Sequence, residues 1–365
     1  MDDRLGITQI LTSEVVMDSS PGVPYMRLAR RNKEIVQSAE LSSFVVRCVC
    51  ARVRLLLRVE PEELAAMSPS ELVERGFADP IKIFIKSEPH KLQKIREGKL
   101  RIISNVSLVD QIIERLLSTP QNKLEIRRWA TCPSKPGMGL NDSGLQELYS
   151  TLQQKWQEGA KLAESDVSGW DWSIPYWLLQ MDAEARVRLA NASNGPWAHL
   201  VRCRVEVLAR KLFYLSDGQM WEQTVPGVQA SGSFNTSSTN SRMRVMVGWV
   251  EGQPWVMAMG DDDVEEEGEA APDYGRRGLR VKEYKECVGG VVEFCSTRFP
   301  GSWKGYPTQV GRMLFRLLSH SSAVLGQHPE FRAQFLQEIR HHPEKAEIEG
   351  KVDSIIALLS KPCQQ

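Results

Sequence analysis

The feature that most constrains this chain is an apolar run that ends in a glycine and three consecutive aspartates. Val256 to Met259 predicts a short buried strand, bounded by Pro254 before it and Gly260 after it. The three carboxylates that follow, Asp261 to Asp263, repel one another when they share a turn, so a bound cation would offset the cost of placing them together. Mg2+ is the obvious candidate, because it takes oxygen ligands and leaves room for phosphates. A solvated acidic hairpin is the alternative, since four glutamates lie between residues 265 and 269.

Charge is balanced over the chain and segregated along it. The 365 residues include 46 basic and 46 acidic side chains, so the net charge does not indicate a nucleic-acid partner. Between Lys82 and Arg101, however, seven basic residues accompany two glutamates, whereas Asp261 to Glu269 holds seven acids and no base. This segregation fits a protein that holds a polyanion and a metal in one place, with solvated charged faces as the alternative.

Cysteine usage and hydropathy exclude several classes of protein. The seven cysteines form no Cys-x-x-Cys pair, which favours a reduced, cytosolic setting over a disulfide framework or a zinc site. Met1-Asp-Asp-Arg4 is unlike the start of a signal peptide, and no run approaches the roughly 18 apolar residues that span a bilayer. We therefore expect a soluble protein.

A second acidic pattern lies between Leu162 and Pro175. Asp166 comes at the end of an expected strand, and Asp171 follows five residues later, just before a helix that should begin near Pro175. Asp171 could be no more than a carboxylate at a helix N-terminus. Asp166, at the end of a strand, fits a functional role better.

Residues 225 to 240 form a glycine-punctuated loop that runs into an expected helix. A spacing of four places Thr236 and Asn240 on one helical face, with Ser231 in the loop before it. The segment is rich in hydroxyls and poor in helix formers, so local propensity does not account for it. We interpret this helix as a binding face.

The remaining patterns predict a basic hairpin and several helices. Two expected strands, 79–85 and 100–103, flank a cationic loop that could line a channel for phosphates, although lysine-rich tips also keep sheet edges soluble. The apolar stripe of residues 144–159 predicts a scaffold helix, and the chain from Pro307 onward predicts a small helical bundle.

Taken in chain order, these patterns resemble the palm of the RNA-dependent RNA polymerases of positive-strand RNA viruses. Three of them match the family's motifs A, B and C in the right order and at workable spacing. The matching residues are Asp166 and Asp171 for motif A, Ser231, Gly232, Thr236 and Asn240 for motif B, and Gly260, Asp261 and Asp262 for motif C.

Four further segments extend the resemblance across residues 20 to 298. They are similar to motif G, which guides the template, to motif F, the basic strands over the nucleotide channel, to the lysine of motif D, and to the primer-grip turn of motif E. In that order, the segments are Ser20-Pro21-Gly22-Val23-Pro24; Lys86-x-Glu88, Lys94 and Lys99-x-Arg101; Lys282; and Phe294-Cys295-Ser296.

Within that family, the chain is most similar to the plant sobemovirus and polerovirus branch. The phrases that carry this likeness are Ala258-Met-Gly-Asp-Asp, Val264-Glu265 and Glu293-Phe-Cys-Ser. Asp263 departs from it, because the branch places a small polar residue there. Motif G already arrives at residue 20, so we expect part of the N-terminal fingers to be missing, as in a trimmed product or a fragment.

The resemblance implies template-directed RNA synthesis for viral genome replication and transcription, in which the nucleotidyl group of an NTP is transferred to an RNA 3′-hydroxyl. Negative charge then builds up on the attacking and leaving oxygens, and two Mg2+ ions, or Mn2+, can stabilise it. Asp166, Asp261 and Asp262 would be the metal ligands. Lys282 would be the general acid that protonates the pyrophosphate.

The resemblance also assigns nucleotide and RNA contacts. A ribose is recognised by its 2′-hydroxyl, which both donates and accepts hydrogen bonds. The residues at the sugar would be Asp171, Ser231 and Asn240, with Gly232 and Thr236 as further nucleotide-binding residues. Those at the triphosphate would be Lys86, Lys94 and Arg101. The residues at the RNA strands would be Ser20, Gly22, Lys91, Lys99, Phe294, Cys295 and Ser296.

The implied fold is α+β, a right-hand arrangement of fingers, palm and thumb, in which the palm is an antiparallel sheet backed by helices. We expect fingers at 1–160 with an insertion at 191–225, palm at 161–190 and 226–299, and a short helical thumb at 300–365. The implied partners are template and nascent RNA, NTPs and a genome-linked protein primer. The implied location is the host cytoplasm, in replication complexes that associate peripherally with membranes.

Two other functions remain as alternatives. A two-metal nuclease or phosphatase would also cluster aspartates, but it has no need of a ribose-sensing helix or a basic hairpin. A catalytically weak or truncated polymerase-like scaffold could bind RNA without extending it, although the intact aspartate set argues against this.

Overall fold

The computed structural model describes residues 3–90, 92–320 and 328–359. The chain divides into two compact units, each treated separately below. The first comprises Met1–Gly137, Asp166–Asp263 and Gly268–Lys282, and the second comprises Met138–Ser165, Val264–Glu267 and Glu283–Gln365. Lys91, expected to contact RNA, lies outside the described residues.

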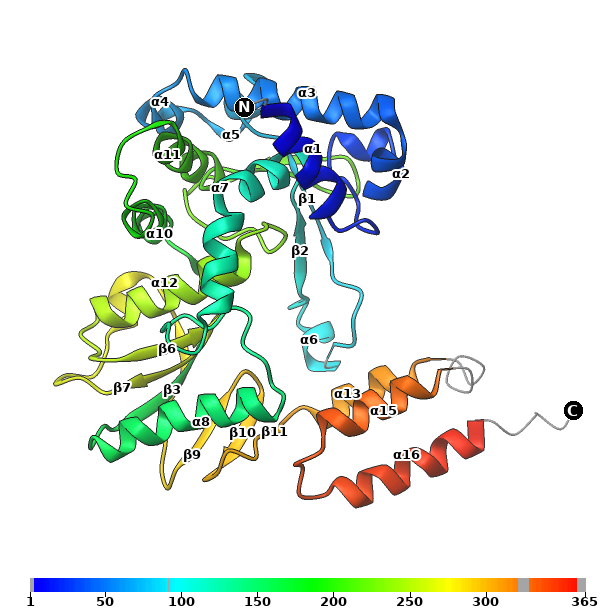
Figure 1. Cartoon of the computed structure of the whole chain (residues 1–365), viewed down its shortest axis with the longest axis vertical. Helices are drawn as coiled ribbons and strands as arrows, with labels where there is room; N and C mark the ends of the chain where they lie inside the picture. Colours follow the sequence, from blue (N-terminus) through cyan, green and yellow to red (C-terminus); the bar gives the residue numbers. More distant parts are fainter. Residues whose placement is uncertain (1–2, 91, 321–327, 360–365) are drawn as a thin grey trace, which may run out of the picture. The chain divides into compact units, whose positions relative to one another are not determined.

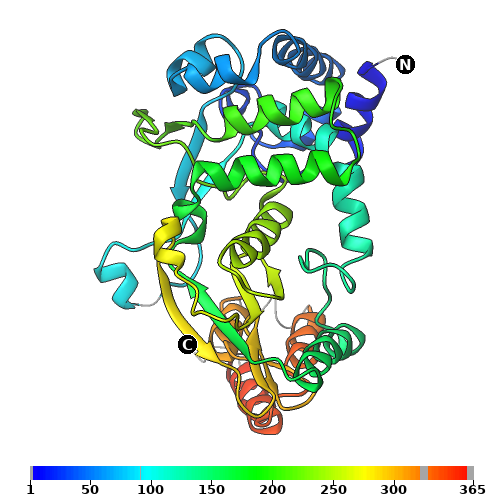
Figure 2. The same cartoon turned by 90° about the vertical axis from the view of Figure 1, so that its left-hand side faces the viewer.

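The first unit has a large helical core. Apolar side chains from the long helices α3, α7, α10 and α12 meet there, and Val49, Ile112, Leu178 and Met243 are fully buried in it. Helices α10 and α11, in green, lie side by side (Figure 2). The helices of this unit are α1 (Asp3–Ser13), η1 (Tyr25–Arg27), α2 (Asn32–Gln37), α3 (Ala39–Leu56), α4 (Pro61–Ala66), α5 (Pro69–Glu74), α6 (Leu92–Arg96), α7 (Leu108–Arg127), α9 (Trp170–Ser173), α10 (Tyr176–Leu189), α11 (Pro196–Leu208), α12 (Thr236–Val250) and η2 (Tyr274–Arg277).

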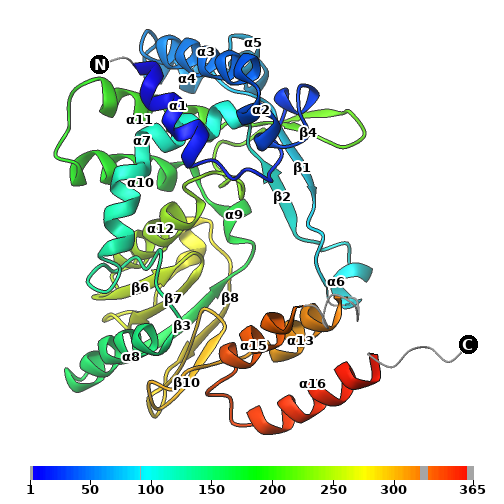
Figure 3. The ribbon, with the colours of Figure 1, turned by 45° about the vertical axis from the view of Figure 1, so that its right-hand side comes forward.

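The expected basic hairpin is present in the first unit. Strands β1 (Ile81–Ile85) and β2 (Ile102–Asn105) pair antiparallel, and the connection between them carries the short helix α6 (Figure 3). The segment expected as an insertion adds two strands to the same sheet, β4 (Leu212–Tyr214) and β5 (Met220–Glu222). The sheet order is β2-β1-β4-β5.

A second sheet has the order β6-β7-β3-β8. Its strands are β6 (Val256–Met259), β7 (Asp262–Glu266), β3 (Leu162–Val167) and β8 (Val281–Glu286). The Glu267 amide donates to the Lys161 carbonyl at 2.8 Å, so the end of β7 lies beside the start of β3. β7 and β3 are therefore antiparallel, so the first residues of β7 lie beside the last residues of β3.

Helix α12 packs on β6 of this sheet (Figure 1). Polar side chains on one face contact β6, β7 and α9, and they are Ser237, Asn240, Ser241 and Arg244. The opposite face carries residues that bond to α7 and α10. Tertiary contacts on both faces thus stabilise a segment whose composition disfavours a helix.

The second unit combines a helix, a small sheet and the C-terminal helices. Helix α8 (Asp142–Gln157) begins at Asn141, whose side chain accepts a hydrogen bond from the Gly144 amide at 2.9 Å. The sheet order is β11-β10-β9, and Leu317, Phe335, Ile339 and Val352 form the core of the terminal helices. The remaining elements are β9 (Val291–Phe294), β10 (Thr297–Pro300), β11 (Tyr306–Pro307), α13 (Val310–Leu318), α15 (Pro329–Glu338) and α16 (Lys345–Leu359).

The α+β class and the expected elements are confirmed, including the strand over residues 256–259 and the scaffold helix near residues 144–159. The two units group residues differently from fingers, palm and thumb, and that three-part division stays a prediction. The alternative of a solvated acidic hairpin is wrong at one position, because Glu265 is fully buried on β7, which has a strand on each side. No helix within the described residues is long and apolar enough to cross a membrane.

Candidate active site

The Gly260-Asp-Asp segment is a tight turn between β6 and β7. Gly260 has a φ of +66°, which side chains disfavour and which hairpin turns of two residues require at their first central position. Asp261 and Asp262 are exposed at this turn. The Gly260 amide donates to the Ser241 hydroxyl of α12 at 2.9 Å, and that hydroxyl donates to the Ser237 carbonyl at 2.6 Å. Ser241, which the sequence analysis missed, thus ties the acidic turn to the helix of motif B.

Asp166 lies near the C-terminal end of β3, beside the start of the neighbouring strand β7. Its carboxylate is half-exposed and binds the Lys282 ammonium of β8, with Nζ–Oδ distances of 3.0 and 2.9 Å. The structure therefore brings together Asp166 and Lys282, two residues that the sequence places 116 positions apart.

Asp171 and Asn240 are in direct contact. The Asn240 side-chain Nδ2 donates to Asp171 Oδ1 at 2.7 Å, while the buried Asn240 Oδ1 has no hydrogen-bond partner among the described residues. Burial raises the pKa of the Asp171 carboxyl; the hydrogen bond from Asn240 opposes the rise, the Asp261 charge adds to it and the Arg101 charge opposes it. Residues of motifs B, C and F thus each influence the Asp171 carboxyl of motif A.

The loop before α12 packs tightly against strand β2. Ser231 Oγ accepts a hydrogen bond from the Ser104 amide at 3.0 Å. A Cβ atom on Gly232 would lie 2.0 Å from the Ser104 carbonyl oxygen, so only glycine fits this approach. The Thr236 hydroxyl donates to the carbonyls of Ala230 and Ser233 at 3.0 and 2.9 Å, which closes the loop onto the start of the helix. Thr236 is thus engaged with its own loop.

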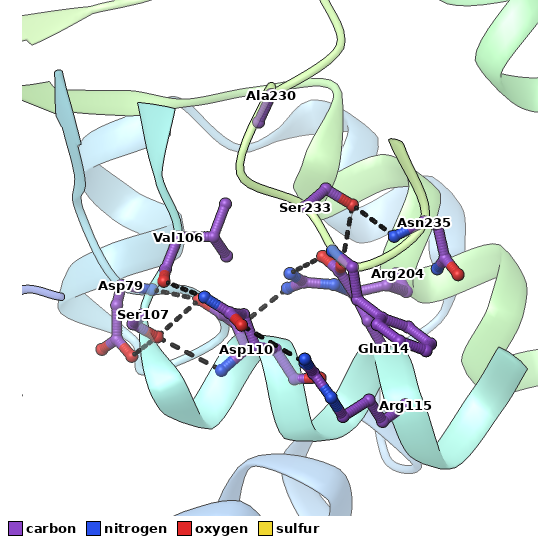
Figure 4. Close-up of polar contacts among 12 residues, drawn as sticks. Asp79, Val106, Ser107, Asp110, Glu114, Arg115, Arg204, Ala230, Ser233 and Asn235 are labelled. Carbon is purple, nitrogen blue, oxygen red and sulfur yellow. Dashed lines mark hydrogen bonds and ion pairs between the residues drawn. The ribbon is translucent and has the colours of Figure 1, made fainter. Parts of the chain in front are cut away.

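The other side of this loop rests on α7 (Figure 4). Glu114 Oε2 accepts hydrogen bonds from the Ser233 hydroxyl and the Phe234 amide, each at 2.7 Å, and Oε1 binds Arg204 at 2.8 Å. Arg204 also binds Asp110 at 2.8 Å. Asp110, Glu114, Arg204 and Ser233 are buried, and no local pattern in the sequence pointed to these contacts.

The basic hairpin carries a carboxylate that holds two of its cations. Glu88 binds Lys86 at 3.0 Å and Arg101 at 2.9 Å, and its side chain is 5% exposed. Burial alone would raise the pKa of Glu88, but the Lys86 and Arg101 charges lower it to about 2. Glu88 is therefore ionised over the whole working range of pH. Lys94 is exposed on α6, and Lys99 binds Glu97 at 2.9 Å.

The segment expected to guide the template packs against the start of α7. The Pro21 carbonyl accepts a hydrogen bond from the Leu108 amide at 2.8 Å. The Gly22 amide donates to the Ser20 hydroxyl at 3.3 Å, and a Cβ atom on Gly22 would lie 2.9 Å from Ser107 Cα. Packing therefore requires glycine at position 22, and RNA contacts of Ser20 and Gly22 stay predictions.

The expected primer-grip segment in the second unit is a hairpin turn. Cys295 and Ser296 have φ values of +52° and +54° between the paired strands β9 and β10. Phe294 is 1% exposed, so its ring belongs to the core and the turn presents Cys295 and Ser296. An RNA contact at this turn stays a prediction.

Asp263, the departure from the expected pattern, has a structural partner. Its carboxylate binds Arg244 of α12 at 2.8 Å, and both side chains are fully buried. The Arg244 guanidinium also lies 4.7 Å from the ring centroid of Tyr274. Asp263 therefore joins β7 to α12, and the exposed Asp261 and Asp262 remain as the metal-ligand candidates.

The chemistry of the donor set fits a divalent metal ion. Asp166, Asp261 and Asp262 offer exposed carboxylate oxygens, the ligands that Mg2+ and Mn2+ prefer. Asp166 already binds one cationic group, the Lys282 ammonium. Within the described part of the chain, no three acidic, His or Cys side chains are grouped closely enough to form a ready metal site.

Comparisons with known proteins agree with this geometry. A family model described as viral RNA-directed RNA polymerase matches residues 4–327. The chain is 42% identical over 351 residues to the RNA-directed RNA polymerase of Mushroom bacilliform virus, covering 93% of this chain and 82% of that protein. It is 43% identical over 294 residues to the replicase polyprotein P2AB of Southern bean mosaic virus and 36% identical over 349 residues to protein P1-P2 of Potato leafroll virus. Those matches cover 78% and 90% of this chain, but only 30% and 32% of the longer proteins.

Solved structures support the fold. The RNA-dependent RNA polymerase of a human picorbirnavirus aligns with a TM-score of 0.60, covering 75% of this chain and 55% of that one. Its sequence identity is 14%, so this likeness shows the right-hand polymerase fold alone. The chain therefore belongs to the viral RNA-directed RNA polymerases, as the family model and the relatives at 36–43% identity establish.

Proposed function

We propose that the chain extends RNA by transferring the nucleotidyl group of an NTP to a 3′-hydroxyl, with Asp166, Asp261 and Asp262 as the ligands of two Mg2+ ions. The observation that carries this proposal is the arrangement of the carboxylates. Asp166 ends β3, Asp262 begins the antiparallel neighbour β7, and Asp261 lies in the turn just before it. When bound there, the ions would lower the pKa of the 3′-hydroxyl and stabilise the leaving pyrophosphate.

Asp171 and Asn240 are proposed to recognise the ribose. Their mutual hydrogen bond fixes both side chains, and the buried Asn240 Oδ1 lies without a partner among the described residues. A ligand hydroxyl would satisfy that oxygen and so repay part of its desolvation cost. The Ser231 hydroxyl, whose oxygen already accepts from Ser104, has its proton to donate. A 2′-hydroxyl can meet both needs, because it donates and accepts.

Lys86 and Arg101 are proposed to hold the triphosphate, with Lys94 further along the hairpin. Glu88 orients both cations through contacts at 3.0 and 2.9 Å, and a phosphate would replace the bulk water around their exposed sides. Lys282 is proposed to give a proton to the pyrophosphate, which requires it to exchange its contact with Asp166 for one with the leaving oxygen.

Replacing Asp261 with Asn tests the catalytic assignment. The substitution keeps the shape of the side chain but removes a charged metal ligand, so elongation of a primed RNA template in Mg2+ should fall by roughly a hundredfold or more. RNA binding, measured by fluorescence anisotropy, should be unchanged. Near-normal extension by this variant would reject Asp261 as a ligand, and shortened RNA in place of lengthened RNA would indicate a nuclease.

Replacing Asn240 with Ala tests the ribose assignment. Loss of the amide removes the partner of Asp171 and the candidate acceptor, so the preference for NTP over dNTP should fall by roughly tenfold or more. The ratio of kcat/KM values for single-nucleotide incorporation measures this preference. An unchanged ratio would place ribose recognition elsewhere.

We further propose that the enzyme serves viral transcription as well as replication, primed by a genome-linked protein, in peripherally membrane-associated complexes in the host cytoplasm. Replication is supported by the similarity to the replicase polyproteins of Southern bean mosaic virus and Southern cowpea mosaic virus, at 43% and 41% identity. Transcription, the primer and the location rest on the resemblance of the motifs to the family. Cell fractionation of the tagged protein during infection tests the location.

A further inference from the structure

One face of α7 supports the whole loop that leads into the ribose-sensing helix. Glu114, Ser118 and Asn122 recur at intervals of four and therefore form one stripe along α7. Glu114 binds Ser233 (Figure 4). Ser118 and Asn122 both bind Asn235. None of the three side chains was part of any motif in the sequence.

Glu114 makes the central contacts of this stripe. Its Oε2 accepts from the Ser233 hydroxyl and the Phe234 amide, both at 2.7 Å, and the side chain is fully buried. The adjacent residue Arg115 places its guanidinium 4.4 Å from the centroid of the Phe234 ring. Consecutive residues of α7 thus hold the backbone and the side chain of Phe234.

Asn235, the last residue before α12, is held by the other two members of the stripe. Its Nδ2 donates to the Ser118 hydroxyl at 3.1 Å, and its Oδ1 accepts from Asn122 Nδ2 at 2.9 Å. Ser231 and Gly232 meet Ser104 on the opposite side of the loop. The loop is therefore fixed between β2 and α7, and its position is set by both.

Glu114 also forms a buried ion pair with Arg204, so removing its charge affects more than the loop. Arg204 lies between Glu114 and Asp110 with 2.8 Å contacts to each, and all three side chains are buried. Removing the Glu114 charge would leave Arg204 with a single buried carboxylate and leave the donors of Ser233 and Phe234 with weaker partners. The loop would then lose its support on the α7 side while keeping Ser104 on the other.

We propose that Glu114 is a positioning residue for nucleotide selection, acting through Ser233 and Phe234 on the placement of Ser231, Gly232 and Asn240. This inference rests on the ribose site proposed above. Glu114 itself touches neither the sugar nor the metal ligands. A shift of the loop changes where the Ser231 hydroxyl and the Asn240 amide lie, so the distinction between a ribose and a deoxyribose weakens before RNA binding does.

Single-nucleotide incorporation by the full chain on a primed RNA template tests the proposal. For Glu114→Gln, the ratio of kcat/KM for NTP over dNTP should fall roughly five- to tenfold, the effect of a lost charge-assisted hydrogen bond. Ser233→Ala removes one of the two loop contacts and leaves the Phe234 bond, so it should shift the ratio in the same direction by a smaller factor. Because Ser233→Ala retains the Glu114–Arg204 pair, it provides the test if Glu114→Gln does not fold.

Asp110→Asn is the matched control. It also removes one buried carboxylate from Arg204, at the same 2.8 Å distance, but Asp110 has no contact with the loop among those that the structure describes. Both carboxylate variants should lower the melting temperature, and only Glu114→Gln should change the NTP/dNTP ratio.

The outcomes separate this inference from the ribose site on which it rests. If Asn240→Ala changes the ratio while Glu114→Gln and Ser233→Ala both retain the wild-type value, the positioning role is overturned and the ribose site stands. An equal change in Asp110→Asn would also overturn the role, by showing a general effect of the charge network. If Asn240→Ala leaves the ratio unchanged, the ribose site fails and the positioning role fails with it.

Discussion

The Asp166 carboxylate is shared with the Lys282 ammonium, which contacts both of its oxygens at 2.9 and 3.0 Å. The same oxygens are the proposed ligands of a metal ion, so Lys282 and the metal compete for them. The pair is half-exposed, and its attraction is correspondingly modest. Metal binding should therefore release Lys282 toward the place where pyrophosphate would leave.

Lys282→Gln is expected to tighten metal binding while slowing elongation. Loss of the competing ammonium should lower the Kd for Mn2+ by about two- to fivefold, the effect of an exposed ion pair of up to ~1 kcal/mol. Isothermal titration with Mn2+ alone, without NTP or RNA, measures this directly. Lys285→Gln is the control, because Lys285 lies on the same strand and binds Glu164 at 2.6 Å, away from the proposed ligands. Equal Mn2+ affinities for the two variants would contradict the competition.

Asp171→Asn is expected to stabilise the fold at neutral pH. Burial raises the pKa of Asp171, so between the unfolded and folded pKa values the native state binds more protons than the unfolded state. The free-energy cost of the charge is fully present above the folded pKa and diminishes as pH falls through that window. Thermal unfolding from pH 8 to pH 4.5 should show a higher melting temperature for the variant at pH 8 and a shrinking difference toward pH 4.5. A constant difference would contradict a raised pKa.

At the scale of single residues, the sequence predicted site residues that lie in a recognisable local pattern, but not which of them become buried by tertiary contacts. Asp166, Asp171, Asn240 and Asp261 could be found because each follows a strand or lies on a patterned helix. The burial of Asp263 could not, since three consecutive aspartates carry nothing to tell a buried partner of Arg244 from an exposed ligand. That distinction depends on which side of β7 each residue faces.

At the scale of elements, α12 explains how a polar segment becomes a long helix. Asn240, Ser241 and Arg244 bond toward α9 and the strands, whereas Arg242 binds Asp182 of α10 and Glu125 of α7, both at 2.8 Å. The sequence pattern predicted the helix and its binding face. It could not predict the partners, because helical spacing identifies a face but not the element that will cover it.

The Arg244–Asp263 pair should be the most sensitive connection between α12 and β7. Asp263→Ala would remove the carboxylate that binds the fully buried Arg244 guanidinium at 2.8 Å, at a cost of about 3–5 kcal/mol in the free energy of unfolding. Urea denaturation measures the loss. The double variant Asp263→Leu/Arg244→Met, which removes both charges, should recover much of the stability. Glu347→Ala, which breaks an exposed pair with Lys351, is the control and should be close to neutral. Equal losses for the single and double variants would show that lost packing, not the broken ion pair, dominates.

At the scale of the whole molecule, the order of motifs was predictable, and so was the α+β class. The boundaries of the compact units were not, because three of the breaks fall inside strands β3, β7 and β8. A strand pattern gives no sign that its two ends belong to different units. The contacts that hold the motif B loop could not be predicted either, because Glu114 lies 119 and 120 positions from its partners Ser233 and Phe234.

Those separations have a consequence for how the protein forms during synthesis. Helix α7 leaves the ribosome more than a hundred residues before the loop that it supports. The hydrogen bonds of Glu114 to Ser233 and Phe234 can therefore form only after the loop has been synthesised. Closing so long a stretch of chain is entropically costly and slow compared with forming the helix itself. The nucleotide site should consequently mature late, after the helical core around α3 and α7. A nascent chain halted before residue 233 would lack both the loop and the α12 side chains of the core, so Glu114 of α7 would still face water.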